Sequence, residues 1–154
     1  MPPPIRQDAQ VASRWRAAPG SFLALMALYE SNHLRLRWLA GDLRSLQGVR
    51  RSSAVGDCDL VMTVLELSPY TTTLELTYDF SSANDAVATA PDMRLRLYHD
   101  AGVAEALDWG EGHEHRILRE LRQHAERELD HRWARNIMLN KWLEYCLDRG
   151  HSFR

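Results

Sequence analysis

Cysteine is scarce in this sequence, and its pattern excludes a zinc site or a disulfide framework. Cys58 and Cys146 are the only two cysteines among 154 residues, and they belong to no CxxC pair. Folds that depend on disulfides or zinc carry several cysteines at short spacing. We therefore expect two buried, reduced thiols, and the sequence indicates no cofactor.

The sequence also lacks an excess of either charge and any long apolar run. Nineteen Lys and Arg stand against 21 Asp and Glu, a net charge of -2, so the overall field does not attract nucleic acid or anionic lipid. The apolar run at residues 22–29 is far shorter than the roughly 20 residues that span a membrane. We expect a cytoplasmic protein that does not bind membranes.

Familiar catalytic and metal-binding signatures are missing as well. The chain has no phosphate-binding glycine loop, GxSxG turn, HExxH motif or EF-hand loop. The chain has seven histidines, but His113 and His115 would point to different faces of a helix, and neither has another histidine at i+4. We expect no metal site.

The first 20 residues differ in composition from the rest. They hold four of the six prolines and no sustained apolar period, which predicts a flexible tail over residues 1–20 and a single domain over residues 21–154. Ser21 is a suitable N-cap for a helix that begins at Phe22 and ends before Gly48. The apolar stripe of this helix includes Asn32, and an asparagine in such a stripe can set the register of a coiled-coil dimer. We instead favour packing of the stripe against a sheet in the core, because the stripe is short.

Two hairpins are predicted in the middle of the chain. Residues 73–80 alternate apolar and polar side chains, residues 58–67 are aliphatic and β-branched, and Ser68 and Pro69 lie between them as a turn. A three-residue loop would place Val64 opposite Leu74. It would also place Asp59 opposite Asp79 and strain Tyr70.

The second hairpin has a clearer turn, because Gly102 suits the left-handed last position of a three-residue loop after Asp100 and Ala101. The polar residues 81–91 would connect the two hairpins. The predicted register pairs Met93 with Trp109, Arg94 with Asp108, Leu95 with Leu107, Leu97 with Glu105 and His99 with Val103.

The C-terminal part of the chain is predicted to be helical. Residues 114–147 contain no proline or glycine, and their apolar residues recur at helical spacing but lose phase near residues 124–130. Gly150 would end this helix or helix pair. The predicted fold is therefore α+β, with an N-terminal helix, a four-stranded antiparallel sheet of two hairpins and a C-terminal helix or helix pair.

Two groups of polar residues could carry a function. His99 and Glu105 would be diagonal neighbours on the apolar sheet face, where burial shifts proton affinities toward neutrality and favours an acid–base pair. The alternative is a structural ion pair at the sheet edge. A local basic cluster could dock a nucleic-acid backbone, but a solvated face is favoured because no sustained basic run exists. This cluster consists of Arg35, Arg37, Arg44, Arg50 and Arg51 with Trp38.

Three segments carry a family resemblance: PDMRLRLYHDAGVAEAL at residues 91–107, ELSPYTTTLEL around Tyr70, and NIMLNKWLEYCLDRG at residues 136–150. They resemble the YqiB-like family of uncharacterised bacterial proteins over residues 25–150. The resemblance implies a bacterial, cytosolic protein and no known activity. It singles out the residues within the matching motifs: Tyr70, Arg94, Arg96, Tyr98, His99, Asp100 and Glu105.

The sequence leaves two functions open. We expect a non-catalytic binding or adaptor module for a protein or small-molecule partner, because folding accounts for every strong pattern and no nucleophile is identifiable. The alternative is a small enzyme that uses His99 and Glu105 as an acid–base pair. A concave pocket lined by His99, Glu105 and Glu66 would favour the enzyme.

Overall fold

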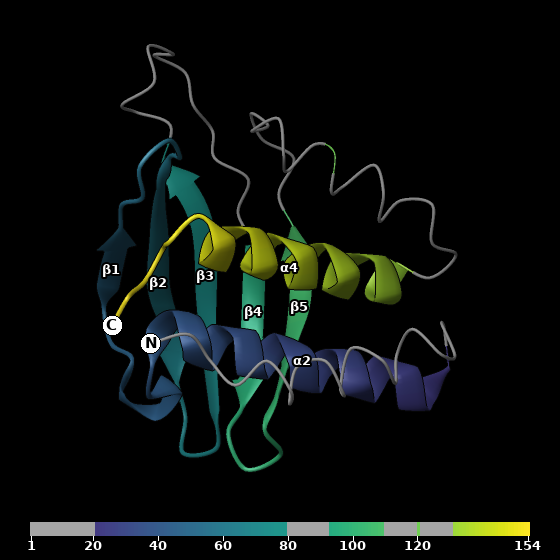
Figure 1. Cartoon of the computed structure of the whole chain (residues 1–154). Helices are drawn as coiled ribbons and strands as arrows, with labels where there is room; N and C mark the ends of the chain where they lie inside the picture. Colours follow the sequence, from purple (N-terminus) through teal and green to yellow (C-terminus); the bar gives the residue numbers. More distant parts are fainter. Residues whose placement is uncertain (1–20, 80–92, 110–119, 121–130) are drawn as a thin grey trace.

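The computed structural model describes residues 21–79, 93–109, 120 and 131–154. In these residues five strands form one antiparallel sheet in sequence order, and two helices cover one of its faces (Figure 1). The elements are α2 (Phe22–Ala40), the 3-10 helix η1 (Leu43–Ser45), β1 (Val49–Ser52), β2 (Asp59–Leu67), β3 (Thr71–Asp79), β4 (Met93–Tyr98), β5 (Val103–Trp109) and α4 (His131–Asp148).

The predicted α+β class and antiparallel sheet are confirmed, but the prediction of four strands is wrong by one. Strand β1 was missed. It is a short edge strand with two arginines and one buried residue, Ser52, so it lacks the apolar alternation by which strands are recognised. The predicted tail at residues 1–20, the connection at 81–91 and the helix break near 124–130 lie outside the described residues.

Helix α2 begins as predicted and ends earlier than predicted. The Ser21 hydroxyl accepts a hydrogen bond from the Ala24 amide at 3.0 Å. At the other end Gly41 adopts a φ of 79°, which favours glycine, and its amide donates to the Arg37 carbonyl at 2.8 Å. Leu43 and Leu46 are nevertheless buried. Neither lies in an α-helix, because both follow Gly41, where α2 has ended.

The first hairpin has the predicted register along most of its length. Val64 lies opposite Leu74, and Asp59 lies opposite Asp79. A β-bulge between Val64 and Glu66 shifts the pairing near the turn, which closes with a 2.9 Å hydrogen bond from the Ser68 amide to the Thr71 carbonyl. The three-residue loop is wrong, because Leu67 pairs with Thr72 and residues 68–71 form the turn. No described non-glycine residue has a positive φ, so Tyr70 lacks the strain that the shorter loop would impose.

The second hairpin follows the predicted register at its open end and departs from it near the turn. Met93 lies opposite Trp109, and Arg94 lies opposite Asp108, as predicted. A bulge after Arg94 then shifts β5, and the pairs Leu95–Leu107, Leu97–Glu105 and His99–Val103 are wrong. The observed pairs are Leu95–Ala106, Arg96–Glu105, Leu97–Ala104 and Tyr98–Val103.

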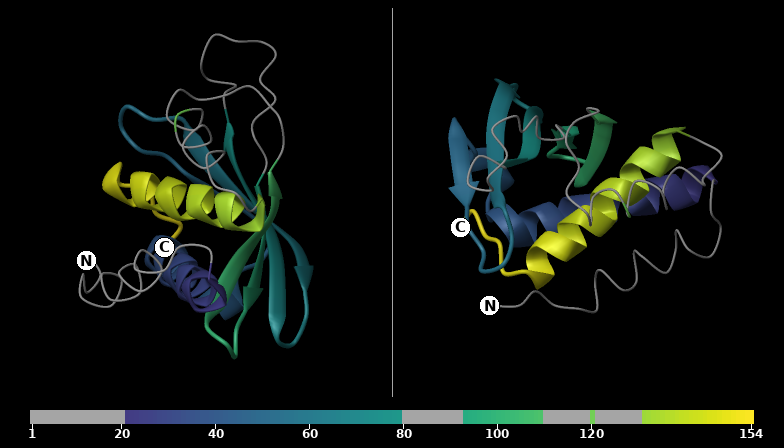
Figure 2. Two further views of the ribbon diagram at one scale, coloured as in Figure 1. Left: turned by 90° about the vertical axis from the view of Figure 1, so that its right-hand side faces the viewer. Right: turned by 90° about the horizontal axis from the view of Figure 1, so that it is seen from above.

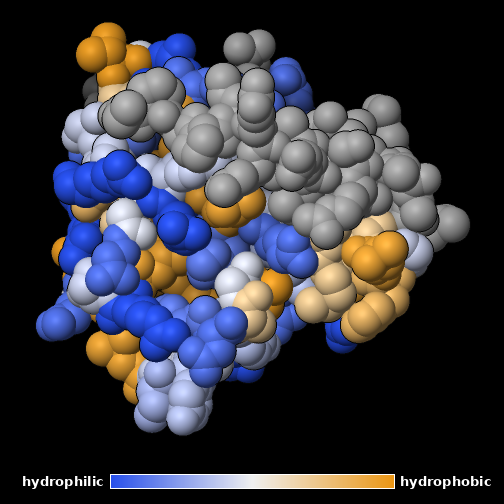
Figure 3. Space-filling view, turned by 60° about the horizontal axis from the view of Figure 1, so that its bottom comes forward, coloured by the Kyte–Doolittle hydropathy of each residue, from blue (hydrophilic) through white to orange (hydrophobic). Residues whose placement is uncertain are grey.

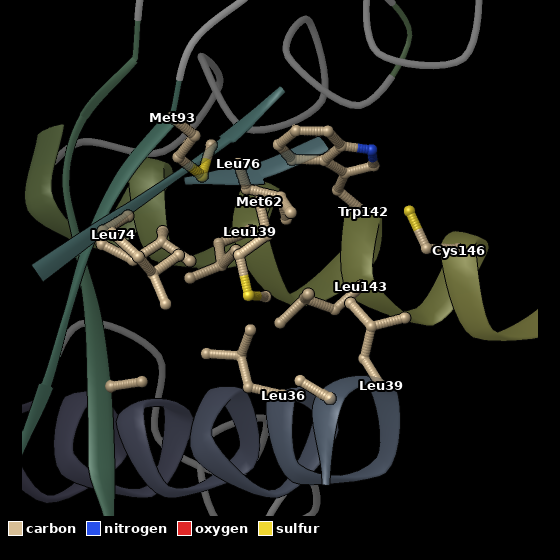
Figure 4. Packing of buried hydrophobic residues seen from close by; sticks show 14 of the residues in the cluster. Leu36, Leu39, Met62, Leu74, Leu76, Met93, Leu139, Trp142, Leu143 and Cys146 are labelled. Atoms are coloured by element: carbon tan, nitrogen blue, oxygen red, sulfur yellow. The ribbon is translucent and has the colours of Figure 1, made fainter. Parts of the chain in front are cut away.

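The core lies between the sheet and the two helices. Leucines of α2 and α4 meet the inward-facing side chains of β2, β3 and β4 (Figure 4). Tyr78 and Trp142 are both buried, with ring centroids 5.5 Å apart. The described part of the chain contains no helix long and apolar enough to cross a lipid bilayer.

A buried polar network joins α2 to α4 on the same side of the sheet (Figure 2). The Asn136 side-chain oxygen accepts from the Ala106 amide of β5 at 2.8 Å and from Asn32 at 3.3 Å. Asn140 donates to Ser31 at 2.8 Å and to the Asn32 oxygen at 3.1 Å. These contacts align the two helices in parallel and satisfy a backbone amide of the edge strand.

We expect Asn136→Ala to lower the free energy of unfolding by about 3 kcal/mol, because the Ala106 amide and Asn32 would both lose a buried partner. Urea denaturation measures this change. Asp148→Ala, an exposed position in the same helix, is the control and should change stability by less than about 0.5 kcal/mol. A loss of that small size for Asn136→Ala would show that the network does not hold the helices to the sheet.

Candidate functional site

The structure divides the predicted site residues between two places. Tyr70, His99 and Asp100 lie where the β2–β3 and β4–β5 turns project beyond α2 (Figure 2). Arg94, Arg96, Tyr98 and Glu105 lie on the sheet face opposite the helices, which we call the open face. We call the first place the hairpin-end site and define it by His33, Arg37, Arg44, Tyr70, Thr72, His99 and Asp100.

Hydrogen bonds fix the two turns of the hairpin-end site to each other. The His99 amide donates to the Tyr70 carbonyl at 2.9 Å, and the His99 Nε2 lies 2.8 Å from the Thr72 hydroxyl. Arg44 of η1 donates from Nη2 to Asp100 Oδ1 at 2.8 Å. The side chains of this ion pair are 56% and 67% exposed, so water competes for both charges.

Arginines shape the electrostatics of the hairpin-end site. Burial, then Arg37 and then His99, lower the pKa of His33 to about 4. Burial and then Arg44 lower the pKa of His99, although Asp100 and Asp42 act in the opposite direction. Both histidines are therefore neutral at pH 7, and positive charge next to each of them opposes its protonation.

The open face is a lattice of cross-strand ion pairs. Arg51 contacts Asp59 at 3.0 Å and Asp79 at 2.7 Å, which offsets the repulsion between the two opposed aspartates. Arg94 lies between Glu75 and Asp108 in the register. The described charges of this face are Arg51, Arg94 and Arg96 against Asp59, Glu66, Glu75, Asp79, Glu105 and Asp108, three positive against six negative, a net of -3.

Glu105 does not lie on the apolar sheet face, where the sequence placed it. The bulge turns it to the open face opposite Arg96, where its Oε1 accepts from the Tyr98 hydroxyl at 2.5 Å. Tyr29 of α2 also bonds Glu105, and burial followed by the charge of Glu105 raises the pKa of Tyr29 to about 12. The hydrogen bonds of Glu105 thus go to tyrosines and those of His99 to Thr72 and Tyr70, so the predicted acid–base pair lacks its geometric basis.

A buried Ser–His–Asp array lies near the C-terminal end of α4 and was missed by sequence reasoning. His151 Nδ1 is 3.0 Å from the Ser52 hydroxyl, and His151 Nε2 is 2.9 Å from Asp57 Oδ2. Tyr78 also donates to Asp57 Oδ2 at 2.9 Å. The residues are up to 99 positions apart in sequence, and no local motif relates them.

This array is closed to substrate, despite its likeness to a catalytic triad. The side chains of His151 and Asp57 are fully buried, and the Ser52 oxygen accepts from the Ser152 amide at 2.9 Å. Cys146 lies 3.7 Å from the Tyr78 hydroxyl, and burial raises the pKa of both groups. The array therefore holds the chain end after α4 against the sheet.

The expectation about the cysteines is confirmed in part. Cys58 and Cys146 are both free, Cys146 is buried and Cys58 is half-buried. Burial raises the pKa of the Cys58 thiol. In the described residues no group of three or more His, Cys, Asp or Glu side chains is arranged to hold a metal ion.

The five arginines of the predicted basic cluster lie in separate places. Arg35 is buried and contacts Glu144 at 3.4 Å, and Arg51 belongs to the open face. Arg50 donates to the Phe153 carbonyl at 3.4 Å. Arg37 and Arg44 remain exposed at the hairpin-end site, and Arg37 makes no side-chain ion pair with the described residues. The five arginines therefore do not form one surface that could follow a nucleic-acid backbone.

The family whose description reads "Protein of unknown function (DUF1249)" matches residues 35–152. The chain belongs to this family. It is 29% identical over 129 residues to the "Uncharacterized protein YqiB" of Escherichia coli strain K12, an alignment that covers 84% of this chain and 90% of that protein. The YqiB proteins of E. coli O6:H1 and O157:H7 give the same values. The predicted resemblance is thus confirmed, and no solved structure matches the chain.

We expect stability to fall as the pH is lowered from 6.5 to 4. His33 has a folded-state pKa of about 4 and an unfolded-state value near 6.5, so the unfolded chain binds more protons in this window. With its partial exposure discounted, His33 should account for roughly 1 to 2 kcal/mol. His33→Gln should flatten the pH dependence of the urea midpoint, whereas His131→Gln, at an exposed histidine, should not. Equal slopes in all three proteins would contradict the assignment.

We expect Ser52 to be unreactive toward a fluorophosphonate probe in the folded protein, because its oxygen is buried and hydrogen-bonded. His151→Ala should lower the free energy of unfolding by about 3 kcal/mol, since it leaves the buried Asp57 without this partner. Mass spectrometry detects the adduct and urea denaturation measures the stability. A covalent adduct on Ser52 in folded protein would mean that the array opens and acts as a nucleophile.

Proposed function

We propose that the protein is a binding module that holds one anionic group, a carboxylate or a phosphate, at the hairpin-end site. The observation that carries this proposal is the convergence of basic side chains from three elements: His33 and Arg37 from α2, Arg44 from η1, and His99 from the β4–β5 turn. Arginine binds both anions through paired hydrogen bonds. Two exposed arginines suffice for one such group and are too few for a polynucleotide.

Asp100 is the ion-pair partner of Arg44 in the structure. Both side chains are more than half exposed, and exposed pairs of this kind contribute about 0 to 1 kcal/mol. A ligand anion can therefore replace the Asp100 carboxylate on Arg44 at little cost. In this proposal Tyr70 and Asp100 border the ligand, whereas Arg94, Arg96 and Tyr98 are engaged with Asp108, Thr73 and Glu105 on the open face.

The enzyme alternative has weaker support. It required His99 and Glu105 to act on one group, but their hydrogen bonds belong to different networks. Glu66 lies opposite Thr73 on the open face. His99, Glu105 and Glu66 are therefore not joined by any hydrogen bond or strand pair in the described residues, and such a joint lining is what would have favoured the enzyme.

Sulfate titration followed by NMR of the histidine rings tests the proposal. Sulfate stays a dianion across the pH range, so any pH dependence belongs to the protein. We expect His99 to shift and saturate, with affinity rising as the pH falls below 6.5, because a bound anion favours protonated His99. Succinate, titrated in parallel, distinguishes a carboxylate from a tetrahedral oxyanion as the favoured ligand.

Matched variants locate the binding site. Arg44→Gln should weaken sulfate binding about tenfold, and Asp100→Asn should strengthen it a few-fold because the competing carboxylate is removed. Arg94→Gln and Asp108→Asn are the controls, since this pair is equally exposed on the opposite face. If the Arg94 variant loses binding and the Arg44 variant keeps it, the anion binds the open face and the proposal is wrong.

A further inference from the structure

The hairpin-end site is bordered by exposed apolar side chains. Leu65, Leu67 and Tyr70 are 50%, 55% and 67% exposed. Leu67 lies opposite Thr72, whose hydroxyl is bonded to the His99 ring, and the Tyr70 carbonyl is bonded to the His99 amide. Seen from the hairpin end, hydrophilic and apolar side chains lie side by side (Figure 3). Leu67 and Tyr70 therefore adjoin the residues that contact His99 in the hairpin-end site.

We propose that this surface binds a protein segment in which a carboxylate stands next to aliphatic side chains. This inference rests on the proposed function and specifies the class of ligand that carries the anionic group. A free inorganic anion would neutralise Arg37 and Arg44 but leave the three apolar side chains in water. A segment that also covers Leu67 and Tyr70 gains the free energy of removing apolar area from water, in addition to the ionic contact.

The charges at this end favour a protein segment over an anionic membrane. Arg37 and Arg44 are accompanied by two carboxylates, Asp42 and Asp100. Surfaces that bind anionic bilayers carry roughly four to eight clustered Lys or Arg, whereas here two arginines stand with two carboxylates. A single ligand carboxylate, in contrast, needs only to take the place of Asp100 on Arg44, so the charge balance at the contact is kept.

Fluorescence anisotropy with labelled peptides tests the partner class. The probes are an alternating Leu–Glu peptide, a Ser–Glu peptide of equal charge and a Leu–Gln peptide of equal apolarity. We expect the Leu–Glu peptide to bind about tenfold more tightly than either of the others, since each lacks one of the two contacts. Vesicles of phosphatidylcholine, with and without phosphatidylglycerol, provide the lipid comparison.

Variants of the protein separate this inference from the proposed function. Leu65→Ser combined with Leu67→Ser, at two leucines outside the hairpin-end site, should lower the affinity for the Leu–Glu peptide about tenfold and leave sulfate binding unchanged. The control is Leu23→Ser, at a leucine that is 69% exposed at the start of α2. Arg44→Gln should weaken both ligands.

Three results would overturn the inference. Equal affinity for the Ser–Glu and Leu–Glu peptides would show that the apolar residues do not take part. Binding to vesicles that contain phosphatidylglycerol, without binding to the Leu–Glu peptide, would identify a lipid surface as the occupant. If neither the peptides nor the vesicles bind, the surface does not bind a protein segment of this kind and the inference is wrong. In each case, sulfate binding by the wild-type protein would still support the proposed function. If the wild-type protein did not bind sulfate, both the proposed function and this inference would be wrong.

Discussion

Three elements, β5, α2 and α4, meet at the side chain of Asn136, and this contact places the two helices against the sheet. Its oxygen accepts the Ala106 amide of the edge strand and the Asn32 side chain of α2, while its nitrogen donates to the Arg132 carbonyl within α4. A buried amide with its partners satisfied fixes a single arrangement, because any slip leaves polar groups stranded. The small side chains of Ala104 and Ala106 leave the room for this approach. Helix α2 is thereby held where His33 and Arg37 reach the hairpin ends.

Local patterns predicted the parts of the fold that are fixed by burial. The alternation of Leu74, Leu76 and Tyr78 predicted the strand, and Ser21 predicted the start of α2. The bulge in β5 was not predictable from the same patterns, because a turn over residues 99–102 and one unpaired residue restore the pairing of Arg94 with Asp108. A correct pair at one end of a hairpin therefore does not establish the pairs at the other end. This is why Glu105 was assigned to the wrong face.

Long-range polar contacts were beyond the reach of the sequence for a different reason. The opposed Asp59 and Asp79 made the predicted register of the first hairpin look unfavourable. Arg51 bridges the two aspartates, and it lies on β1, a strand with no apolar alternation of its own. The Tyr70, His99 and Asp100 candidates are brought together, but Arg37 and Arg44 join them only through the placement of α2 and η1 against the sheet. Charge in a sequence indicates which residues can bind. The register and the helix contacts decide which of them already have a partner.

The chain end after α4 connects the buried array to the candidate site. His151 is fixed by Ser52 and Asp57, and two residues later the Phe153 amide donates to the Leu39 carbonyl. Arg154 then donates to the Arg37 carbonyl at 3.3 Å, where it also offsets the negative end of the helix dipole. Burying charged and polar groups is costly unless each is paired. The array at Asp57 is compatible with folding because its members hydrogen-bond to one another. Its closure holds the C-terminal end of α2 in place, and with it the backbone that carries Arg37 toward the hairpin ends.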